Sequence, residues 1–200
     1  MRGTLTAAFI VLTGSAASAQ DAAAPDAKAL IDTALIGEMR SVLDNEVVAI
    51  SVAAQNVRYA GVDEAKILRL DEEWVAERGA DDKPLIAATL SSPLSTYLVR
   101  TQARALGLYA EIFVMDRNGL NVGQSSITSD FWQGDEAKFQ KSFGVGPTAV
   151  FIDDPEWDED NRIWRAQVSM TIVDATAVPV GSATFEVNLN ELQRRRLAGS

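Results

Sequence analysis

One segment of this 200-residue sequence constrains the fold more than any other, the stretch from Glu111 to Phe143. It opens with the apolar run Ile112–Met115, which is typical of a strand with both faces covered. Asn118-Gly119 follows and predicts a two-residue type I′ hairpin turn, because such a turn needs residues that tolerate positive φ. We expect a second strand over residues 120–126, then Thr128-Ser129-Asp130, and then a short helix through Phe143.

The second half of the chain predicts the rest of an antiparallel sheet. Residues 163–173 alternate between apolar and polar side chains, as in a strand with one buried face. Residues 148–152 predict a strand before it, and residues 180–189 predict a strand after it. Because short turns join these segments, neighbouring strands should run antiparallel. The sequence therefore predicts a five-stranded antiparallel sheet within residues 109–190.

The first half of the chain is helical by its apolar periodicity. Apolar residues recur every three to five positions over residues 27–59, which predicts one long helix. A second helix should span residues 63–78, and Ser92-Pro93 should begin a third that stops near residue 107. Residues 84–90 are ambiguous. Helices followed by strands indicate the α+β class.

The N-terminus is typical of a targeting segment. A positive Met1-Arg2, a short apolar run and Ala17-Ser18-Ala19 predict a signal peptide over residues 1–19, cleaved after Ala19. A mobile leader should follow over residues 20–26, then one domain over residues 27–192 and a tail over residues 193–200. We expect the mature protein to be exported, soluble and either periplasmic or secreted.

Two absences and the charge limit the function. The sequence contains neither histidine nor cysteine, which excludes imidazole bases, thiol nucleophiles and disulfides. The net charge of -10 disfavours a nucleic-acid partner, since phosphate binding needs a positive field. We predict no catalytic residue, no metal ion and no cofactor.

Aromatic and polar side chains gather on the predicted helix after the hairpin and on the facing strand. These candidate ligand-binding residues are Asp130, Trp132, Asp135, Lys138, Arg165, Gln167 and Ser169. Tryptophan offers a flat apolar wall, and the polar groups can orient a small molecule by hydrogen bonds. The alternative is that Trp132 and Phe139 are core residues and the charges are solvated, as on any amphipathic helix.

Three segments resemble the Cache (PDC) family of extracytoplasmic sensor domains. They are residues 116–119 (DRNG), residues 128–138 (TSDFWQGDEAK) and residues 167–169 (QVS). The resemblance covers about residues 31–192 and is densest over residues 111–190. It implies a PAS-like sheet backed by a long N-terminal helix, with a ligand pocket between the sheet and the segment after the hairpin.

The resemblance implies a sensory module for a small polar metabolite, a carboxylate or an amino acid. We expect Lys138 and Arg165 to hold an anionic group, Asp135 an amine and Trp132 the stem. The sequence shows no membrane-spanning segment or output domain, so the bound state would have to reach a membrane sensor kinase or chemoreceptor by docking.

Three alternatives stay open. The protein could be an interaction or structural protein without a small ligand, which uses the long helix to form a homodimer or to dock. It could be a hydrolase that works through paired carboxylates. The acidic segment of residues 153–161 could bind Ca²⁺, although a solvated turn fits its sequence better.

Overall fold

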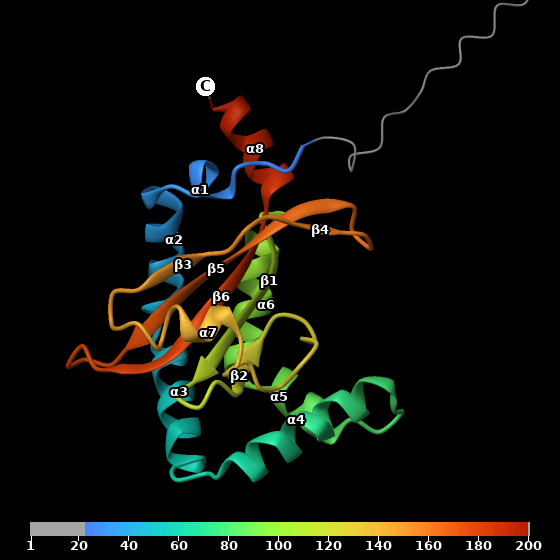
Figure 1. The fold of residues 1–200 in the computed structure, drawn as a ribbon, viewed down its shortest axis with the longest axis vertical. Coiled ribbons are helices and arrows are strands. Elements are labelled where there is room, and N and C mark those ends of the chain that lie inside the picture. The colour runs from blue at the N-terminus through green and yellow to red at the C-terminus, as the bar shows by residue number, and fades with distance from the viewer. Residues whose placement is uncertain (1–22, 200) are drawn as a thin grey trace, which may run out of the picture.

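The computed structural model describes residues 23–199, in which helices pack on an open antiparallel sheet (Figure 1). The strands are β1 Tyr109–Asp116, β2 Asn121–Gln124, β3 Val150–Ile152, β4 Glu156–Asp158, β5 Ile163–Val173 and β6 Pro179–Asn188. The helices are α1 Ala27–Leu30, α2 Thr33–Leu43, α3 Glu46–Arg58, α4 Glu64–Gly79, α5 Pro84–Leu90, α6 Pro93–Arg104, α7 Ala137–Gln140 and α8 Leu189–Ala198. The predicted α+β class and antiparallel sheet are confirmed. The predicted signal peptide lies outside the described residues.

The sheet has six strands where the sequence predicted five. Its order is β2-β1-β6-β5-β3, and β4 pairs with the start of β5. The extra strand, β4, lies in the acidic segment that was predicted to be only a turn. Trp157 of β4 lies opposite Trp164 of β5, with ring centroids 5.5 Å apart, so cross-strand aromatic packing holds the segment to the sheet.

The long N-terminal helix predicted over residues 27–59 is wrong, because three helices occupy this stretch. The side chain of Asp32 accepts a hydrogen bond from the Leu35 amide and caps α2, and Asn45 caps α3 through the Val47 amide. Asp and Asn favour such caps over helix interiors because their side chains compete for backbone amides. The apolar periodicity runs on across both breaks, which is why it suggested one helix.

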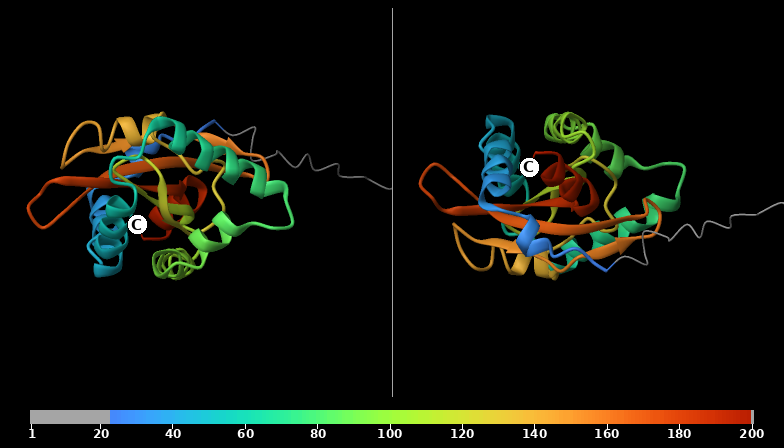
Figure 2. Two further views of the ribbon diagram at one scale, coloured as in Figure 1. Left: turned by 90° about the horizontal axis from the view of Figure 1, so that it is seen from below. Right: turned by 90° about the horizontal axis from the view of Figure 1, so that it is seen from above.

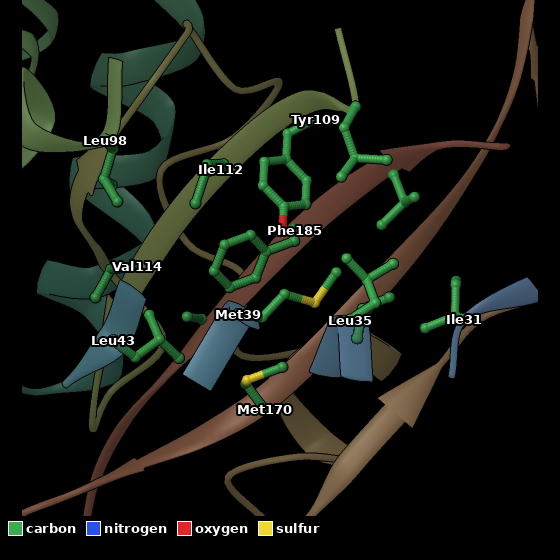
Figure 3. Close-up of a cluster of buried hydrophobic side chains, with 14 of the residues drawn as sticks. Ile31, Leu35, Met39, Leu43, Leu98, Tyr109, Ile112, Val114, Met170 and Phe185 are labelled. Atoms are coloured by element: carbon green, nitrogen blue, oxygen red, sulfur yellow. The ribbon is translucent and has the colours of Figure 1, made fainter. Parts of the chain in front are cut away.

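The main core lies between one face of the sheet and helices α2, α3 and α6 (Figure 2). Leu35 and Met39 of α2 meet Phe185 of β6 there, as Figure 3 shows. The Tyr109 ring packs on Phe185 with centroids 5.2 Å apart. The predicted faces of β5 are confirmed: Ala166, Val168, Met170 and Ile172 are in this core, and Trp164 packs against it.

The opposite face of the sheet is only partly covered. α7 and the segments beside it lie on that side (Figure 2). Phe139 of α7 packs with Phe113 and Met115 of β1, and the Ser142 and Ser182 hydroxyls hydrogen-bond at 2.6 Å. The remaining part of this face carries polar side chains, and it positions the site described below.

The hairpin between β1 and β2 forms where predicted, but its turn is of another type. The Gly119 amide donates to the Asp116 carbonyl at 3.0 Å, and the Asp116 amide donates to the Leu120 carbonyl at 2.9 Å. Gly119 has φ of 80°, while Asn118 is not among the residues with positive φ. This is a three-residue loop that ends in a left-handed glycine, so the type I′ prediction is wrong.

The helix predicted after residues 128–130 and through Phe143 is also wrong, since α7 has four residues. Before it, the segment runs in irregular structure and forms a bridge from Trp132 to Leu120. Asp71 of α4 fixes this segment, because one carboxylate oxygen accepts the amides of Phe131 and Trp132 at 2.8 and 2.9 Å. The Phe131 carbonyl accepts the Asn121 amide at 2.9 Å, so the hairpin takes a backbone group that a helix would need.

The remaining helical predictions are largely confirmed. α4 and α6 begin at the predicted caps Asp63 and Ser92, and the ambiguous residues 84–90 form α5. Residues 193–198, predicted as a tail, belong to α8. This helix is tied to the N-terminal segment, because Arg196 pairs with Asp32 at 2.6 Å. Within residues 23–199, no helix has the length and apolarity that a membrane span requires.

Two glycines should respond in opposite directions to alanine. A Cβ at Gly181 of β6 would overlap the Met115 carbonyl of β1, so Gly181→Ala should lower the free energy of unfolding by about 1–3 kcal/mol. Gly37 lies in α2 with open space around it, and Gly37→Ala should raise that free energy by about 0.5–1 kcal/mol. Urea unfolding measures both, and equal effects would contradict the packing described here.

Candidate functional site

A pocket of about 420 Å³ lies on the polar part of the sheet face, which we call the sheet-face pocket. Its floor is formed by β1, β5 and β6. Its sides are the segment of residues 127–138 and the turn of residues 158–161. It is lined by more polar than apolar surface. Its charged lining residues are Arg78, Glu111, Lys138, Asp158, Asp160, Arg165 and Glu186.

Three side chains form a row across the floor of the pocket. Glu111 of β1 lies directly opposite Glu186 of β6, and Glu186 lies opposite Gln167 of β5. Like charges at opposed positions of neighbouring strands destabilise a sheet unless other groups compensate. Two adjacent carboxylates on a partly covered sheet face therefore lower the stability of the fold. Such unfavourable charge arrangements are common at functional sites.

A β-bulge lies beside Glu111. The pairing register between β1 and β6 shifts between Tyr109 and Glu111 and is regular from Glu111 onward. Glu111 therefore faces the pocket together with Phe113, as alternation along the strand requires. In a regular strand Tyr109 would share that face, but the bulge turns it into the main core instead. The bulge thus keeps the Tyr109 ring out of the space beside Glu111.

Glu186 is buried, and both of its carboxylate oxygens accept hydrogen bonds. Its carboxylate accepts a hydrogen bond from Arg165 Nη1 at 2.7 Å and one from Gln167 Nε2 at 2.8 Å. Arg165 also lies 3.7 Å from the carboxylates of Glu156 and Asp158. The positive charge of Arg165 is therefore shared among acids, and its buried Nε has no hydrogen-bond partner within the described part of the chain.

Glu111 lacks this compensation. Its carboxylate accepts one hydrogen bond, from the Ser126 hydroxyl at 2.6 Å, and it forms none of the ion pairs seen within residues 23–199. Burial, and to a lesser degree the neighbouring charge of Glu186, raises the pKa of Glu111, against the hydrogen bond from Ser126. The pocket thus contains a carboxylate that would gain from a cationic partner.

Lys138 is the buried cation of the pocket. Its Nζ donates to Gln133 Oε1 at 2.9 Å, pairs with Glu136 at 3.0 Å and lies 5.4 Å from the centre of the Phe113 ring. Gln133 is itself buried and donates to the Asp130 carbonyl at 2.8 Å. Lys138 is therefore held in place by several partners, and it has little freedom to turn toward another anion.

The turn of residues 158–161 closes the other side of the pocket. Asp158 accepts hydrogen bonds from the Asp160 and Asn161 amides and from the Asn161 side chain, all at 3.0 Å. The side-chain bond from Asn161 is the largest of several influences that lower the pKa of Asp158. Within the described residues, no group of three or more acidic side chains is arranged to hold a metal ion.

The structure brings together three of the seven predicted site residues: Lys138, Arg165 and Gln167 all line the sheet-face pocket. The other four do not line it. Trp132 packs against the small core beneath α4 and α5 and donates from its indole nitrogen to the Asn118 carbonyl at 2.9 Å. Asp135 is exposed, and Ser169 is buried in a hydrogen bond with Thr184. Asp130 is bonded through its backbone carbonyl.

Sequence reasoning missed four residues that shape the pocket: Glu111, Glu186, Gln133 and Asp158. The alternation of β6 did contain a signal, because Glu186 falls between the core residues Phe185 and Val187 and so must face the other side. The continuous apolar run of residues 112–115 hid the same signal for Glu111, which precedes the core residue Ile112 and so faces the other side.

No protein-family model matches the sequence, and no curated protein matches it. Solved structures do match, at low similarity. One is the ligand-binding domain of the Pseudomonas aeruginosa amino-acid chemoreceptor PctC in complex with GABA, with a TM-score of 0.36 and 14% identity over 74% of this chain and 60% of that one. A Campylobacter jejuni chemoreceptor ligand-binding domain in complex with 4-methylisoleucine has a TM-score of 0.40 and 11% identity, over 78% and 62% of the two chains.

The sensor domain of the V. cholerae histidine kinase DctB also matches, with a TM-score of 0.34 and 17% identity over 80% of this chain and 58% of that one. These chemoreceptor and kinase sensory domains are of the Cache (PDC) type that the sequence resembles. The chain spans about 60% of the length of the first of them, the PctC ligand-binding domain. At such TM-scores and identities, we draw no conclusion from the likeness about ligand or activity.

The raised pKa of Glu111 predicts how stability depends on pH. Because the folded-state pKa lies above the ordinary value of 4.5, ionising Glu111 opposes folding, and this cost appears as the pH rises through the folded-state pKa. The free energy of unfolding of Glu111→Gln, relative to that of the wild type, should therefore be higher at about pH 8 than at about pH 4. Urea unfolding at both pH values measures this.

The non-titrating change Ile112→Val serves as the control, since it should cost about 0.5–1.5 kcal/mol at either pH. If Glu111→Gln behaved like this control, with one constant difference from the wild type, Glu111 would not carry an uncompensated charge.

Proposed function

We propose that this protein binds a small metabolite with an ammonium group, of which amino acids are the foremost class, in the sheet-face pocket. The single observation that carries the proposal is the opposed pair Glu111 and Glu186 on the pocket floor. One of these carboxylates is neutralised by Arg165, and the other has only a hydroxyl partner. An ammonium group would supply the missing positive charge.

The charge of the whole lining supports this choice over a plain carboxylate ligand. Four acidic and three basic side chains line the pocket, so the formal charges of its lining add up to a negative value. Both Lys138 and Arg165 already have carboxylate partners. A dicarboxylate would compete with these partners at both of its ends and would offer Glu111 nothing. In an amino acid, the ammonium group would face Glu111, and its single carboxylate would share Lys138 and Arg165, the residues predicted to hold an anion, with their present partners.

The pocket also favours binding over a purely structural role. Trp132 and Trp164 could have filled the space in front of the sheet, but Trp132 packs beneath α4 and α5, and Trp164 packs against the main core. The inward-facing apolar residues of α2 and α3 are buried against the sheet, while Ile50 and Val57 of α3 are exposed. A homodimer through the N-terminal helices stays a prediction without support from these contacts.

We further propose that the protein acts outside the cytoplasm and conveys its bound state to a membrane sensor kinase or chemoreceptor. The predicted signal peptide supports export. Signalling requires that the partner distinguish the bound form from the empty form. Cross-linking to membranes should therefore increase or decrease when the ligand is added, and a yield that is the same with and without ligand would contradict this part of the proposal.

Ligand screening tests the binding proposal directly. Amino acids and other amines should raise the unfolding midpoint, because a ligand at about 100 times its Kd adds about 2.7 kcal/mol of stability. Dicarboxylates without an amine should have no effect. Glu111→Gln should weaken binding of the best amine about tenfold, as expected for the loss of a charge-assisted hydrogen bond. Calorimetry measures the affinities.

Asp135→Asn is the matched control, since Asp135 is exposed outside the pocket and its loss should leave the affinity unchanged. Hits confined to dicarboxylates, or equal losses in both variants, would contradict the proposal. Turnover of a bound compound would instead favour the carboxylate-dependent hydrolase.

A further inference from the structure

A second pocket, of about 450 Å³, lies on the other side of β2, between α3 and α5. We call it the α3–α5 pocket. It is lined by more apolar than polar surface, in contrast to the sheet-face pocket. Val122, Leu85 and Phe131 form its apolar floor, at the boundary between the main core and the smaller core beneath α4 and α5. Its volume is within the ordinary range for small-molecule sites.

Small side chains on the two helices leave this space open. Ser51, Ala54, Gln55 and Arg58 of α3 line it, and their spacing of three, four and seven residues places them on one face of the helix. Ala88 of α5 lies in the same lining. Larger side chains at these positions would have closed the gap between the helices, as the main core is closed elsewhere.

The polar groups of this pocket point to an anion. Arg58 is the one charged residue in its lining, and among the described residues it forms no ion pair. Its guanidinium instead lies 5.9 Å from the centre of the Tyr59 ring. Arg58 is exposed, as are several other arginines that form no ion pair within residues 23–199, so its guanidinium can turn toward an anion in the pocket. The Tyr59 side chain also lines the pocket, so its hydroxyl is a second potential donor.

We propose that the α3–α5 pocket binds an amphipathic monocarboxylate, with an acyl or aryl group on the apolar floor and the carboxylate on Arg58. Arginine suits this role because its planar guanidinium can bind a carboxylate through two hydrogen bonds. Arg58 lies in the last turn of α3, where the helix end repels anions, so the carboxylate depends on the guanidinium. The proposal does not depend on the function of the sheet-face pocket.

Calorimetry with octanoate and phenylacetate tests the site, with octanamide as the uncharged probe. The two acids should bind to the wild-type protein, and octanamide should bind at least about tenfold more weakly. Arg58→Gln should reduce acid binding about tenfold and leave octanamide binding unchanged. Ala54→Leu should narrow the pocket and weaken binding of all three probes.

Matched controls exist on the same surfaces. Ala53→Leu adds the same bulk to the neighbouring exposed position of α3, outside the lining, and Arg100→Gln removes an exposed arginine of α6. Both should bind octanoate like the wild type. Circular dichroism should show that all variants are folded.

Four results would overturn the proposal. The first is that neither acid binds at millimolar concentration, and the second is that octanoate and octanamide bind equally. The third is that Ala54→Leu leaves acid binding unchanged. The fourth is that Glu111→Gln weakens acid binding instead. The last would place the acid in the sheet-face pocket. Because the amine screen uses other probes and other variants, this proposal and the binding proposal for the sheet-face pocket can fail independently.

Discussion

The antiparallel pairing of β1, β6 and β5 is the constraint on which the rest of the structure depends. It gives the sheet one apolar and one polar face, because side chains alternate along each strand. The apolar face collects α2, α3 and α6 into the main core. The polar face receives only α7 and its neighbouring segments, so part of it stays open. The same pairing that creates the core thus also creates the pocket opposite it.

The sheet-face pocket holds two neighbouring carboxylates, whose repulsion lowers the stability of the fold. The regular pairing of β1 with β6 places Glu111 beside Glu186. Arg165 and Gln167 hydrogen-bond to Glu186, while Glu111 accepts its hydrogen bond from Ser126. Two neighbouring carboxylates cost the fold free energy, and the proposed ligand would compensate for that cost. In the proposed function, stability and binding depend on the same pair of side chains.

The two pockets differ because different elements build them. The sheet-face pocket is formed on strands, whose register fixes the spacing of charged side chains to within one residue. The α3–α5 pocket is formed between helices, where small side chains leave an apolar gap beside a single arginine. One fold therefore contains a pocket whose charged residues sum to a negative charge and an apolar pocket beside Arg58, where we propose that an anion binds.

The sequence by itself determined the α+β class, the strand at residues 163–173, the helix that follows Ser92 and the pocket residues Lys138, Arg165 and Gln167. Local patterns were sufficient there, because alternation and capping act over a few residues. Tertiary structure decided the rest. Asp71 binds the amides of Phe131 and Trp132 from sixty residues away, and the hairpin pairs with the Phe131 carbonyl, so the predicted helix does not form there. The pairing that places Glu111 opposite Glu186 likewise joins distant strands, and no local pattern records such pairing.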